Sequence, residues 1–281
     1  MTTSPIRLGI STCPNDTFAF HAILERKIDL GGLDFQIELL DIQQLNERLF
    51  QGDFDVAKCS FHAALLLADR TWVLPSGSAL GFGVGPLLLA KQSGILPQES
   101  GRITLCPGEH TTATMLLKLF YPEASQVEQV VFSEIMPRLQ DRTADFGVCI
   151  HEGRFTWQQQ GLALIEDLGT RWERETSCPL PLGGLVASRN LPSELTKAVQ
   201  SVVQRSIQYA KQHPQETLPT MRHYAQEFSD EVLMQHVDLY VNDWTVDLGE
   251  VGRKALAMLN QKAISAGLIQ SDTHAIEVFL S

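Results

Sequence analysis

The sequence predicts an α/β protein with two lobes and a group of C-terminal helices packed on one of them. Segments with strand patterns alternate with helical segments in the first third of the chain, which is typical of a largely parallel sheet covered by helices. The alternation starts again near residue 90, and the last third contains mainly helical patterns. Because these helices cannot extend a sheet, we expect them to cover one that is already built.

Strands and helices are expected in strict alternation at the start of the chain. The strands are residues 6–11, 33–41 and 55–60, and the helices are residues 18–26, 45–52 and 61–70. Asn15 or Asp16 is suited to cap the first helix, and Gly52 to end the second. Residues 71–90 carry no charge and are long enough to span a bilayer, but their prolines and glycines favour loop and buried strand.

The middle third repeats this pattern and predicts the second lobe. Strands are expected at residues 102–106, 129–132 and 145–150, and helices at residues 111–120 and 133–142. In the last third, apolar residues recur at helical spacing between Leu195 and Ala210. Ser229 is placed to begin a later helix and Gly267 to end the last one.

Charge and cysteine content narrow the classes of function. The chain has 22 lysine and arginine residues against 33 aspartate and glutamate residues, which gives a net charge of −11. We therefore expect no positively charged surface of the kind that binds nucleic acid or an anionic membrane. The five cysteines are scattered, so we expect neither a disulfide scaffold nor a sequence-local zinc site, and a reducing cytosol suits them. The N-terminal residues form no signal sequence, and we expect a cytoplasmic protein.

Four segments place polar residues directly after a predicted strand, where ligands bind in sheets of this kind. In the first, STCPNDTF, the side chains could meet a ligand, but helix capping is the commoner role. In the second, KCS, the lysine could pair with a substrate carboxylate, although lysines more often lie on the surface and cysteines are more often buried and inert. The candidate residues of these two segments are Asn15, Asp16, Thr17, Lys58, Cys59 and Ser60.

The third and fourth segments carry a candidate anion site and a candidate base. In PGEHTTA, Thr111 and Thr112 open a helix, and their hydroxyls and the first N–H groups suit a carboxylate or phosphate, unless they only cap the helix. In CIHEGRF, His151 follows a buried strand and is a natural proton acceptor, with Glu152 as one carboxylate that could orient its ring. A histidine in this position can also serve only a structural hydrogen bond.

With these segments in view, the chain resembles the 1,4-dihydroxy-6-naphthoate synthase family over essentially its whole length. The likeness rests on six segments in the family's order and approximate spacing: STCPNDTF, KCS, SGSALGFGVGPLLLA, PGEHTTA, IHEGRFT and PLPLGG. The resemblance implies a periplasmic-binding-protein-like fold of type II, with an interlobe cleft and C-terminal helices on lobe one. Lobe one would then contain residues 1–88 and 183–281, and lobe two residues 89–182.

The resemblance also implies a reaction and roles for the candidate residues. The family converts cyclic dehypoxanthinyl futalosine to 1,4-dihydroxy-6-naphthoate and dihydroxyacetone in menaquinone biosynthesis, a carbon–carbon lyase reaction without a metal or organic cofactor. His151 matches the family's proposed base. The substrate-binding segments of the family match Lys58, Cys59, Ser60, Thr111 and Thr112, with Cys59 expected to contribute its backbone, and Asn15, Asp16 and Thr17 are further candidates for binding substrate.

Two other functions are compatible with the sequence. A cytoplasmic sensor of small carboxylates would share the fold without turnover, although a pure binder needs no base. The sister enzyme chorismate dehydratase has a related fold, but STCPNDTF and IHEGRFT favour the naphthoate synthase. The expected partner is a small anionic molecule, and since the net charge repels anions, we expect a cleft made locally positive by helix ends and by Lys58 or Arg154.

Overall fold

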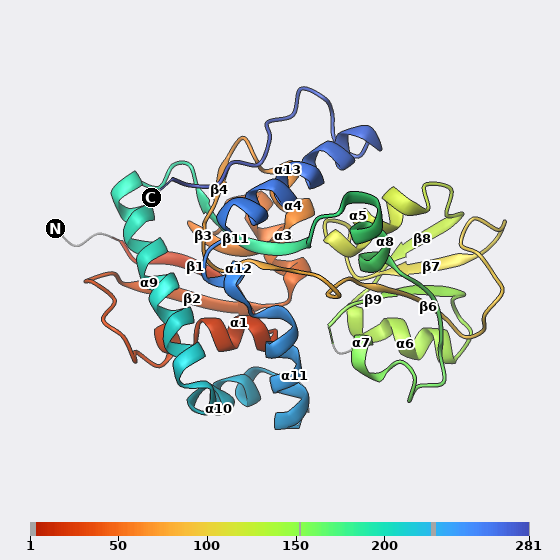
Figure 1. The fold of residues 1–281 in the computed structure, drawn as a ribbon, viewed down its shortest axis with the longest axis horizontal. Helices are drawn as coiled ribbons and strands as arrows, with labels where there is room; N and C mark the ends of the chain where they lie inside the picture. The colour runs from red at the N-terminus through yellow and green to blue at the C-terminus, as the bar shows by residue number, and fades with distance from the viewer. Residues whose placement is uncertain (1–3, 152, 226–228, 281) are drawn as a thin grey trace.

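Two separate β-sheets form the centres of two lobes in the computed structural model, which describes residues 4–151, 153–225 and 229–280 (Figure 1). The sheet of lobe one has the strand order β2-β1-β3-β11-β4, and β5 also pairs with β11. Its strands are β1 (Ile6–Ser11), β2 (Phe35–Leu40), β3 (Val56–Ser60), β4 (Thr71–Val73), β5 (Ala79–Gly81) and β11 (Leu180–Ser188). Lobe one is therefore completed by a strand that returns after lobe two.

The sheet of lobe two has the strand order β10-β6-β9-β7-β8 and comes from one continuous part of the chain. Its strands are β6 (Leu87–Ala90), β7 (Ile103–Cys106), β8 (Gln126–Gln129), β9 (Phe146–Cys149) and β10 (Ala163–Asp167). The predicted lobe boundaries, after residues 88 and 182, fall within β6 and β11. The uncharged stretch 71–90 forms β4, β5 and β6 with the loops between them, as expected.

Both sheets are mixed, so the predicted largely parallel sheet is wrong. β1 pairs in parallel with β2 and β3, and β7 pairs in parallel with β8 and β9. β6, β10 and β11 run antiparallel to the strands with which they pair. Local strand–helix–strand units give the parallel pairs, whereas β6 and β11 follow crossings between the lobes and enter their sheets in the opposite direction.

Helices cover both sheets and extend lobe one. In lobe one they are α1 (Pro14–Ala19), α2 (His21–Leu24), α3 (Ile42–Gln51) and α4 (Phe61–Leu66). In lobe two they are α5 (Thr112–Phe120), α6 (Phe132–Gln140), α7 (Gly153–Thr156) and α8 (Leu168–Thr176). The C-terminal helices are α9 (Ser193–Gln212), α10 (Pro214–Tyr224), α11 (Asp230–Tyr240), α12 (Asp243–Val246) and α13 (Gly249–Ser265). None in the described parts of the chain has the length and apolarity to cross a bilayer.

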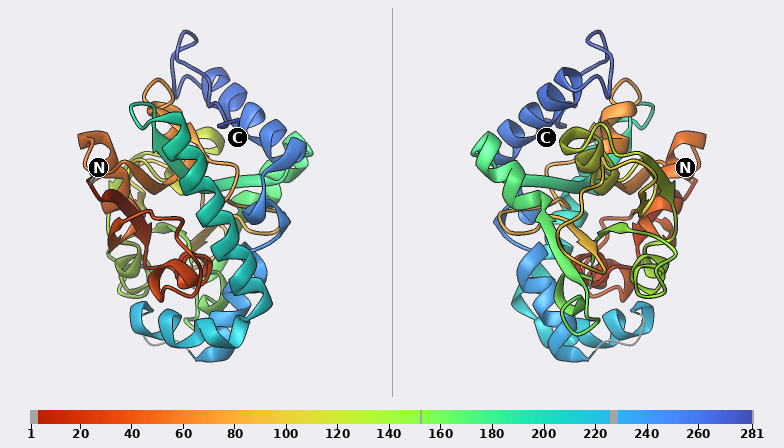
Figure 2. Two further views of the ribbon diagram at one scale, coloured as in Figure 1. Left: turned by 90° about the vertical axis from the view of Figure 1, so that its left-hand side faces the viewer. Right: turned by 90° about the vertical axis from the view of Figure 1, so that its right-hand side faces the viewer.

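The C-terminal helices pack on lobe one, as predicted. Figure 2 shows α9 lying across the outer side of this lobe, where Val199, Val203 and Ile207 join the same apolar cluster as β1. α10 and α11 contact α1, and α13 contacts β11 and also α5 of lobe two. The position of α11 matters for function, because this helix brings residues from the end of the chain to the edge of the cleft.

Most predicted helix ends are confirmed, and one is wrong. The Ser229 hydroxyl accepts a hydrogen bond from the N–H of Val232 at the start of α11, and Gly52 ends α3 in the left-handed region. The first helix starts at Pro14 with Cys13 as its N-cap, and no described side chain caps it. Asp16 does not cap this helix because its carboxylate accepts a hydrogen bond from a buried lysine instead.

Candidate functional site

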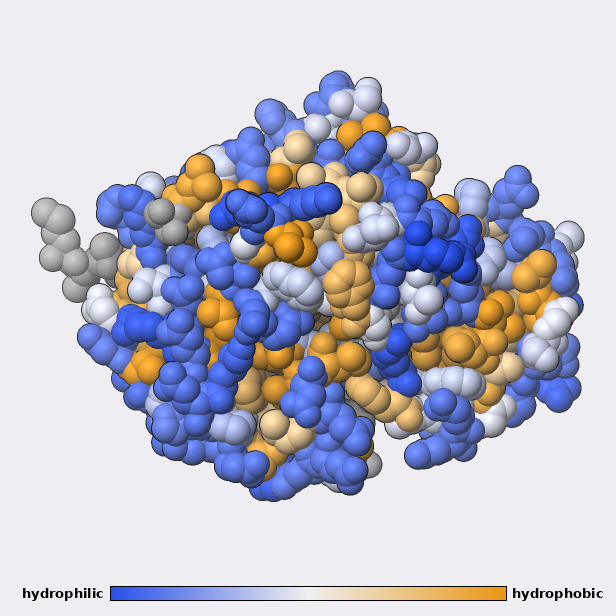
Figure 3. Space-filling view, in the orientation of Figure 1, coloured by the Kyte–Doolittle hydropathy of each residue, from blue (hydrophilic) through white to orange (hydrophobic). Residues whose placement is uncertain are grey.

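The main pocket lies between the lobes and takes its walls from both. Figure 3 shows the surface notched where the lobes meet. The pocket has an empty volume of about 670 Å³, part of it open to solvent. Most of the predicted site residues line it, namely Asn15, Asp16, Lys58, Ser60, Thr111, Thr112 and His151. The sequence segments singled out by their place after strands therefore do converge on one cleft.

Lys58 is already paired within the protein. Its Nζ donates to Asp16 Oδ1 at 2.6 Å and to the Gly77 carbonyl at 2.9 Å, and both charged side chains are buried. Burial raises the pKa of Asp16, and the nearby Lys58 charge opposes that rise. The positive charge that Lys58 was expected to bring to the cleft is therefore balanced by the Asp16 carboxylate.

A partly buried chain of hydrogen bonds continues from Asp16 to the C-terminal helices. The Asn15 Nδ2 group donates to Asp16 Oδ1 at 3.0 Å, and Asn15 Oδ1 lies 3.0 Å from His236 Nε2. Since an amide oxygen only accepts, Nε2 of His236 carries the proton in this contact. Burial lowers the pKa of His236 to about 3, so the ring is uncharged near neutral pH. The chain fixes α11, α1 and β3 relative to one another.

His151 follows β9 at the cleft and lies among aromatic rings and a thiol. Its backbone adopts φ +53°, the left-handed region that few residues other than glycine occupy. The Cys13 Sγ atom lies 3.5 Å from Nδ1 and 3.6 Å from Nε2 of His151. The Phe132 ring meets the imidazole edge-on at 5.1 Å, and the His236 ring stacks on it at 6.2 Å between centroids. Glu152, the carboxylate considered for orienting this ring, lies outside the described residues.

Thr111 and Thr112 open α5 as expected, but their hydroxyls are occupied by protein partners. The Thr111 hydroxyl donates to the Gly108 carbonyl at 2.8 Å and accepts from the Thr114 N–H. The Thr112 hydroxyl donates to the Leu182 carbonyl across the lobes at 2.6 Å. The N–H groups of Thr112 and Ala113 have no carbonyl one turn earlier in the helix to accept from them.

Two predicted residues do not line the pocket. Thr17 is fully buried, and its hydroxyl donates to the carbonyls of Cys13 and Pro14, so it supports the first turn from behind. Cys59 is buried within β3, where it pairs with Gly184 of β11. Burial raises the pKa of the Cys59 thiol to about 12, so this group remains protonated and is a poor nucleophile.

Ser60 does line the pocket, at the junction of β3 and α4. The buried Asn46 of α3 holds it through two hydrogen bonds. Asn46 Nδ2 donates to the Ser60 hydroxyl at 3.1 Å, and Asn46 Oδ1 accepts from the Ser60 N–H at 2.9 Å. Ser60 therefore lies in the wall of the pocket, with α3 as its support.

Arg154 was the second expected source of positive charge, and it too is paired. Its Nη2 atom lies 2.8 Å from Asp167 Oδ2, and Nη1 donates to the Gly85 carbonyl at 2.6 Å. Gly85 and Gly169 approach so closely that an added Cβ on Gly85 would lie 2.2 Å from the Gly169 Cα. Arg154 therefore joins two segments that cross between the lobes instead of facing an anion.

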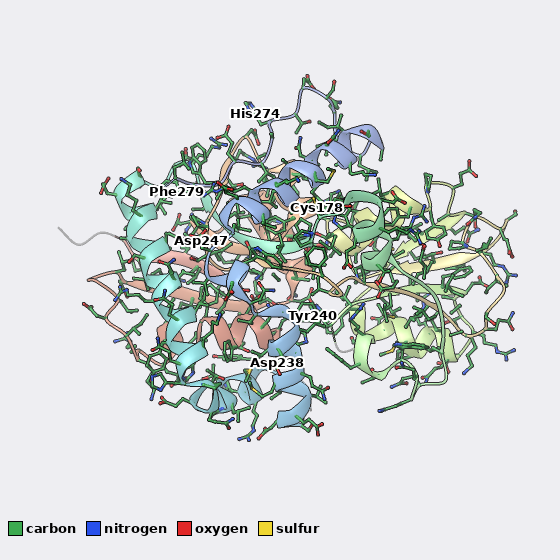
Figure 4. All side chains as sticks on the ribbon, viewed as in Figure 1. Cys178, Asp238, Tyr240, Asp247, His274 and Phe279 are labelled. Carbon is green, nitrogen blue, oxygen red and sulfur yellow. The ribbon has the colours of Figure 1, made fainter. Side chains whose placement is uncertain are left out.

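Sequence reasoning missed several residues of the pocket. Ser11 and Cys13 stand within the first segment, and His236 and Tyr240 come from α11. Figure 4 shows Tyr240 on the side of α11 nearest lobe two. His236 and Tyr240 are four residues apart on the buried face of α11, and that spacing is the signal that could have found them. Within the described ranges, no three histidine, cysteine, aspartate or glutamate side chains gather to hold a metal ion.

Comparison with known proteins identifies close relatives. A family model described as menaquinone biosynthesis matches residues 6–264. The chain is 41% identical over 263 residues to a 1,4-dihydroxy-6-naphthoate synthase of Thermus thermophilus, and the match covers 94% of this chain and 95% of the relative. A solved structure of a protein from Archaeoglobus fulgidus has a TM-score of 0.90 at 30% identity and covers 96% of this chain and 100% of that one.

The same fold occurs in a periplasmic binding protein. The periplasmic aliphatic sulphonate-binding protein of Escherichia coli has a TM-score of 0.64 at 11% identity, covering 100% of this chain and 95% of that one. At this identity the similarity concerns the fold alone. It confirms the predicted periplasmic-binding-protein-like fold, here with two mixed α/β sheets and C-terminal helices.

Proposed function

Since this chain belongs to the 1,4-dihydroxy-6-naphthoate synthases of menaquinone biosynthesis, which are lyases, we propose that it converts cyclic dehypoxanthinyl futalosine to 1,4-dihydroxy-6-naphthoate and dihydroxyacetone. His151 is the proton acceptor in this proposal. The observation that carries it is the position of His151 in the pocket wall, beside an uncharged His236. A protein that only binds carboxylates has no need of a base at this place.

The pocket offers one place for the carboxylate of the aromatic part of the substrate and another for its fused ring. The carboxylate accepts hydrogen bonds from the N–H groups of Thr112 and Ala113 at the positive end of α5. Apolar side chains of the same pocket, among them Ile42, Val84 and Leu182, face the fused ring. This arrangement holds an aryl acid without an unpaired lysine or arginine among the described residues of the cleft.

Proton transfer is then the chemical task of the protein. An imidazole nitrogen of His151 takes a proton from the bound spirocycle, and the electron pair that remains moves to break a ring carbon–carbon bond. Formation of an aromatic naphthalene drives the step, and the three-carbon fragment takes a proton back from the His151 imidazolium and leaves as dihydroxyacetone. Because His236 is uncharged, it does not repel the imidazolium that forms on His151.

The remaining candidate residues hold this arrangement in place. Lys58, Asp16 and Asn15 form the wall opposite lobe two, and Ser60 lies at the start of α4 in the same wall. Thr17 and Cys59 act through the backbone of the segments they belong to. The partner is this small anionic substrate, and we place the reaction in the cytoplasm.

The test compares wild type with His151→Ala and His151→Gln, using cyclic dehypoxanthinyl futalosine and following both naphthoate formation and substrate binding. We expect turnover by the wild type, and binding without naphthoate formation by both variants. His274→Ala is the matched control, because Figure 4 places this exposed histidine on the outer part of lobe one. Binding without turnover by the wild type would favour a sensor, and full activity of His151→Ala would remove the proposed base.

A further inference from the structure

A second hollow adjoins the main pocket at His151. Cys13 and His151 line both, so the two hollows meet at these side chains. The second hollow lies between Thr12 and Asp41 of lobe one, Ser133 of lobe two and the end of α10. It leaves room for a ligand group directly beside His151, outside the pocket that accommodates the aromatic acid.

We propose that this second hollow binds the three-carbon hydroxyketone part of the substrate and holds it as dihydroxyacetone after bond cleavage. The inference rests on the proposed function, which divides one substrate into a flat aromatic acid and a small polar fragment. His151 lines both hollows, so a bond that breaks beside its imidazole would separate a group in one hollow from a group in the other.

Hydroxyl groups supply the polar chemistry of the second hollow. Thr12, Ser133 and Tyr224 line it, and none of their hydroxyls forms a hydrogen bond with another described residue. A hydroxyl both donates and accepts, which suits the hydroxyl and carbonyl oxygens of a hydroxyketone. By contrast, the hydroxyls of Thr111 and Thr112 in the main pocket are engaged by protein partners. Hydroxyls available to a ligand therefore gather on the side of His151 where a small polar fragment would lie.

The start of α6 adds donors on the same side. Phe132 and Ser133 are the first residues of this nine-residue helix, and no described side chain caps it. Their N–H groups have no carbonyl one turn earlier and can donate to a ligand oxygen. On the opposite side, Asp41 uses Oδ1 to accept from the Gln43 N–H at the start of α3, and its carboxylate still faces the hollow. Donors from lobe two and an acceptor from lobe one therefore flank the hollow.

The test is product inhibition in single variants that remove one hydroxyl each. Naphthoate formation is measured with added dihydroxyacetone and, separately, with added 1,4-dihydroxy-6-naphthoate, in the wild type, Ser133→Ala and Thr12→Val. We expect each variant to weaken inhibition by dihydroxyacetone by roughly three- to tenfold, the effect of one lost hydrogen bond, and to leave inhibition by the naphthoate unchanged. Ser201→Ala, which removes an exposed hydroxyl on α9, is the matched control.

The outcomes separate this inference from the proposed function. Unchanged naphthoate inhibition beside weakened dihydroxyacetone inhibition would support two divided hollows in a folded protein. Equal inhibition by dihydroxyacetone in all four proteins would overturn the inference, as would a wild type that dihydroxyacetone does not inhibit. Parallel loss of both kinds of inhibition would also overturn it, because one undivided pocket would then hold both products. Failure of the proposed function would show itself differently, as a wild type without turnover.

Discussion

The two walls of the cleft differ in how their polar groups are used. On the side of lobe one and α11, a largely buried chain of hydrogen bonds joins Lys58, Asp16, Asn15 and His236. On the side of lobe two, the first N–H groups of α5 have no intrahelical partners, and the hydroxyl of Thr112 donates across the cleft to Leu182. The polar groups of the first wall are thus hydrogen-bonded within the protein, whereas the second wall has helix N–H groups that a ligand can use.

The difference indicates that the wall of lobe one and α11 positions the substrate, whereas lobe two supplies the chemistry. A buried polar chain whose members are all paired is rigid, and removing one member leaves another without a partner. Such a wall contributes shape and stability more than binding energy. Lobe two carries the proposed base and the helix end that we propose binds the substrate carboxylate, so changes there should alter catalysis before they alter stability. The following predictions test this contrast.

The largest effect is expected from breaking the buried ion pair of lobe one. Lys58→Met leaves the Asp16 carboxyl buried without its cation, and we expect a loss of about 3–5 kcal/mol in the free energy of unfolding, measured with urea. Adding Asp16→Asn removes the buried charge, so the double variant should recover much of that loss. A single variant that unfolds like the wild type but binds substrate poorly would instead make Lys58 a ligand-binding group.

A comparable effect, spread over the acidic range, is expected in the pH dependence of stability through His236. Its pKa is about 3 in the folded protein against 6.5 ordinarily, so the unfolded chain binds more protons between these pH values. The contribution of this residue is therefore fully present above about pH 6.5 and decreases as the pH falls toward 3, with a slope of about 1.4 kcal/mol per pH unit.

The measurement is urea unfolding of wild type and His236→Gln at several pH values from neutral downward. Glutamine keeps an N–H donor for Asn15 and does not titrate, so the variant should lose stability less steeply on acidification. His274→Gln, at an exposed position, should follow the wild type. Parallel curves for wild type and His236→Gln would show that His236 does not carry this pH dependence.

A modest effect is expected where the two walls meet. Thr112→Val removes the hydroxyl that donates to the Leu182 carbonyl at 2.6 Å, which is a direct link between the lobes. We expect a loss of about 1 kcal/mol in stability and a KM raised by roughly three- to tenfold, since the hydrogen bond helps to fix α5 for the substrate carboxylate. Thr112→Ser keeps the hydroxyl and should restore KM. A fall in kcat at constant KM would contradict a role in binding.

Local patterns predict most of this fold but only part of its topology. Alternating apolar residues indicate β1 and β3, and helical spacing indicates α9 and α13, because these elements follow from neighbours in the sequence. β10 and α8 were not predicted, and β8 begins three residues earlier than expected. The antiparallel position of β11 depends on how the chain crosses between lobes, which short-range periodicity does not contain.

The sequence predicts which residues lie at the candidate site, but not which of them pair with one another. Residues that follow strands converge on the cleft, and this placed Lys58, Thr111 and His151 in its wall. The sequence does not show that Asp16 would neutralise Lys58, because the two lie 42 residues apart and meet only through the sheet. His236 was missed for the same reason, since its helix reaches the cleft from the far end of the chain.

The smallest effect is expected from salt. With Lys58 paired to Asp16 and Arg154 to Asp167, the substrate carboxylate depends on helix N–H groups at close range, and salt screens such contacts little. The net charge of −11 repels an anionic substrate at long range, and salt reduces this repulsion. We therefore expect kcat/KM to change by less than roughly twofold across ordinary ionic strengths. A steep loss of kcat/KM with added potassium chloride would mean that a cation leaves its partner to bind substrate, and Lys58→Met would then abolish the salt dependence.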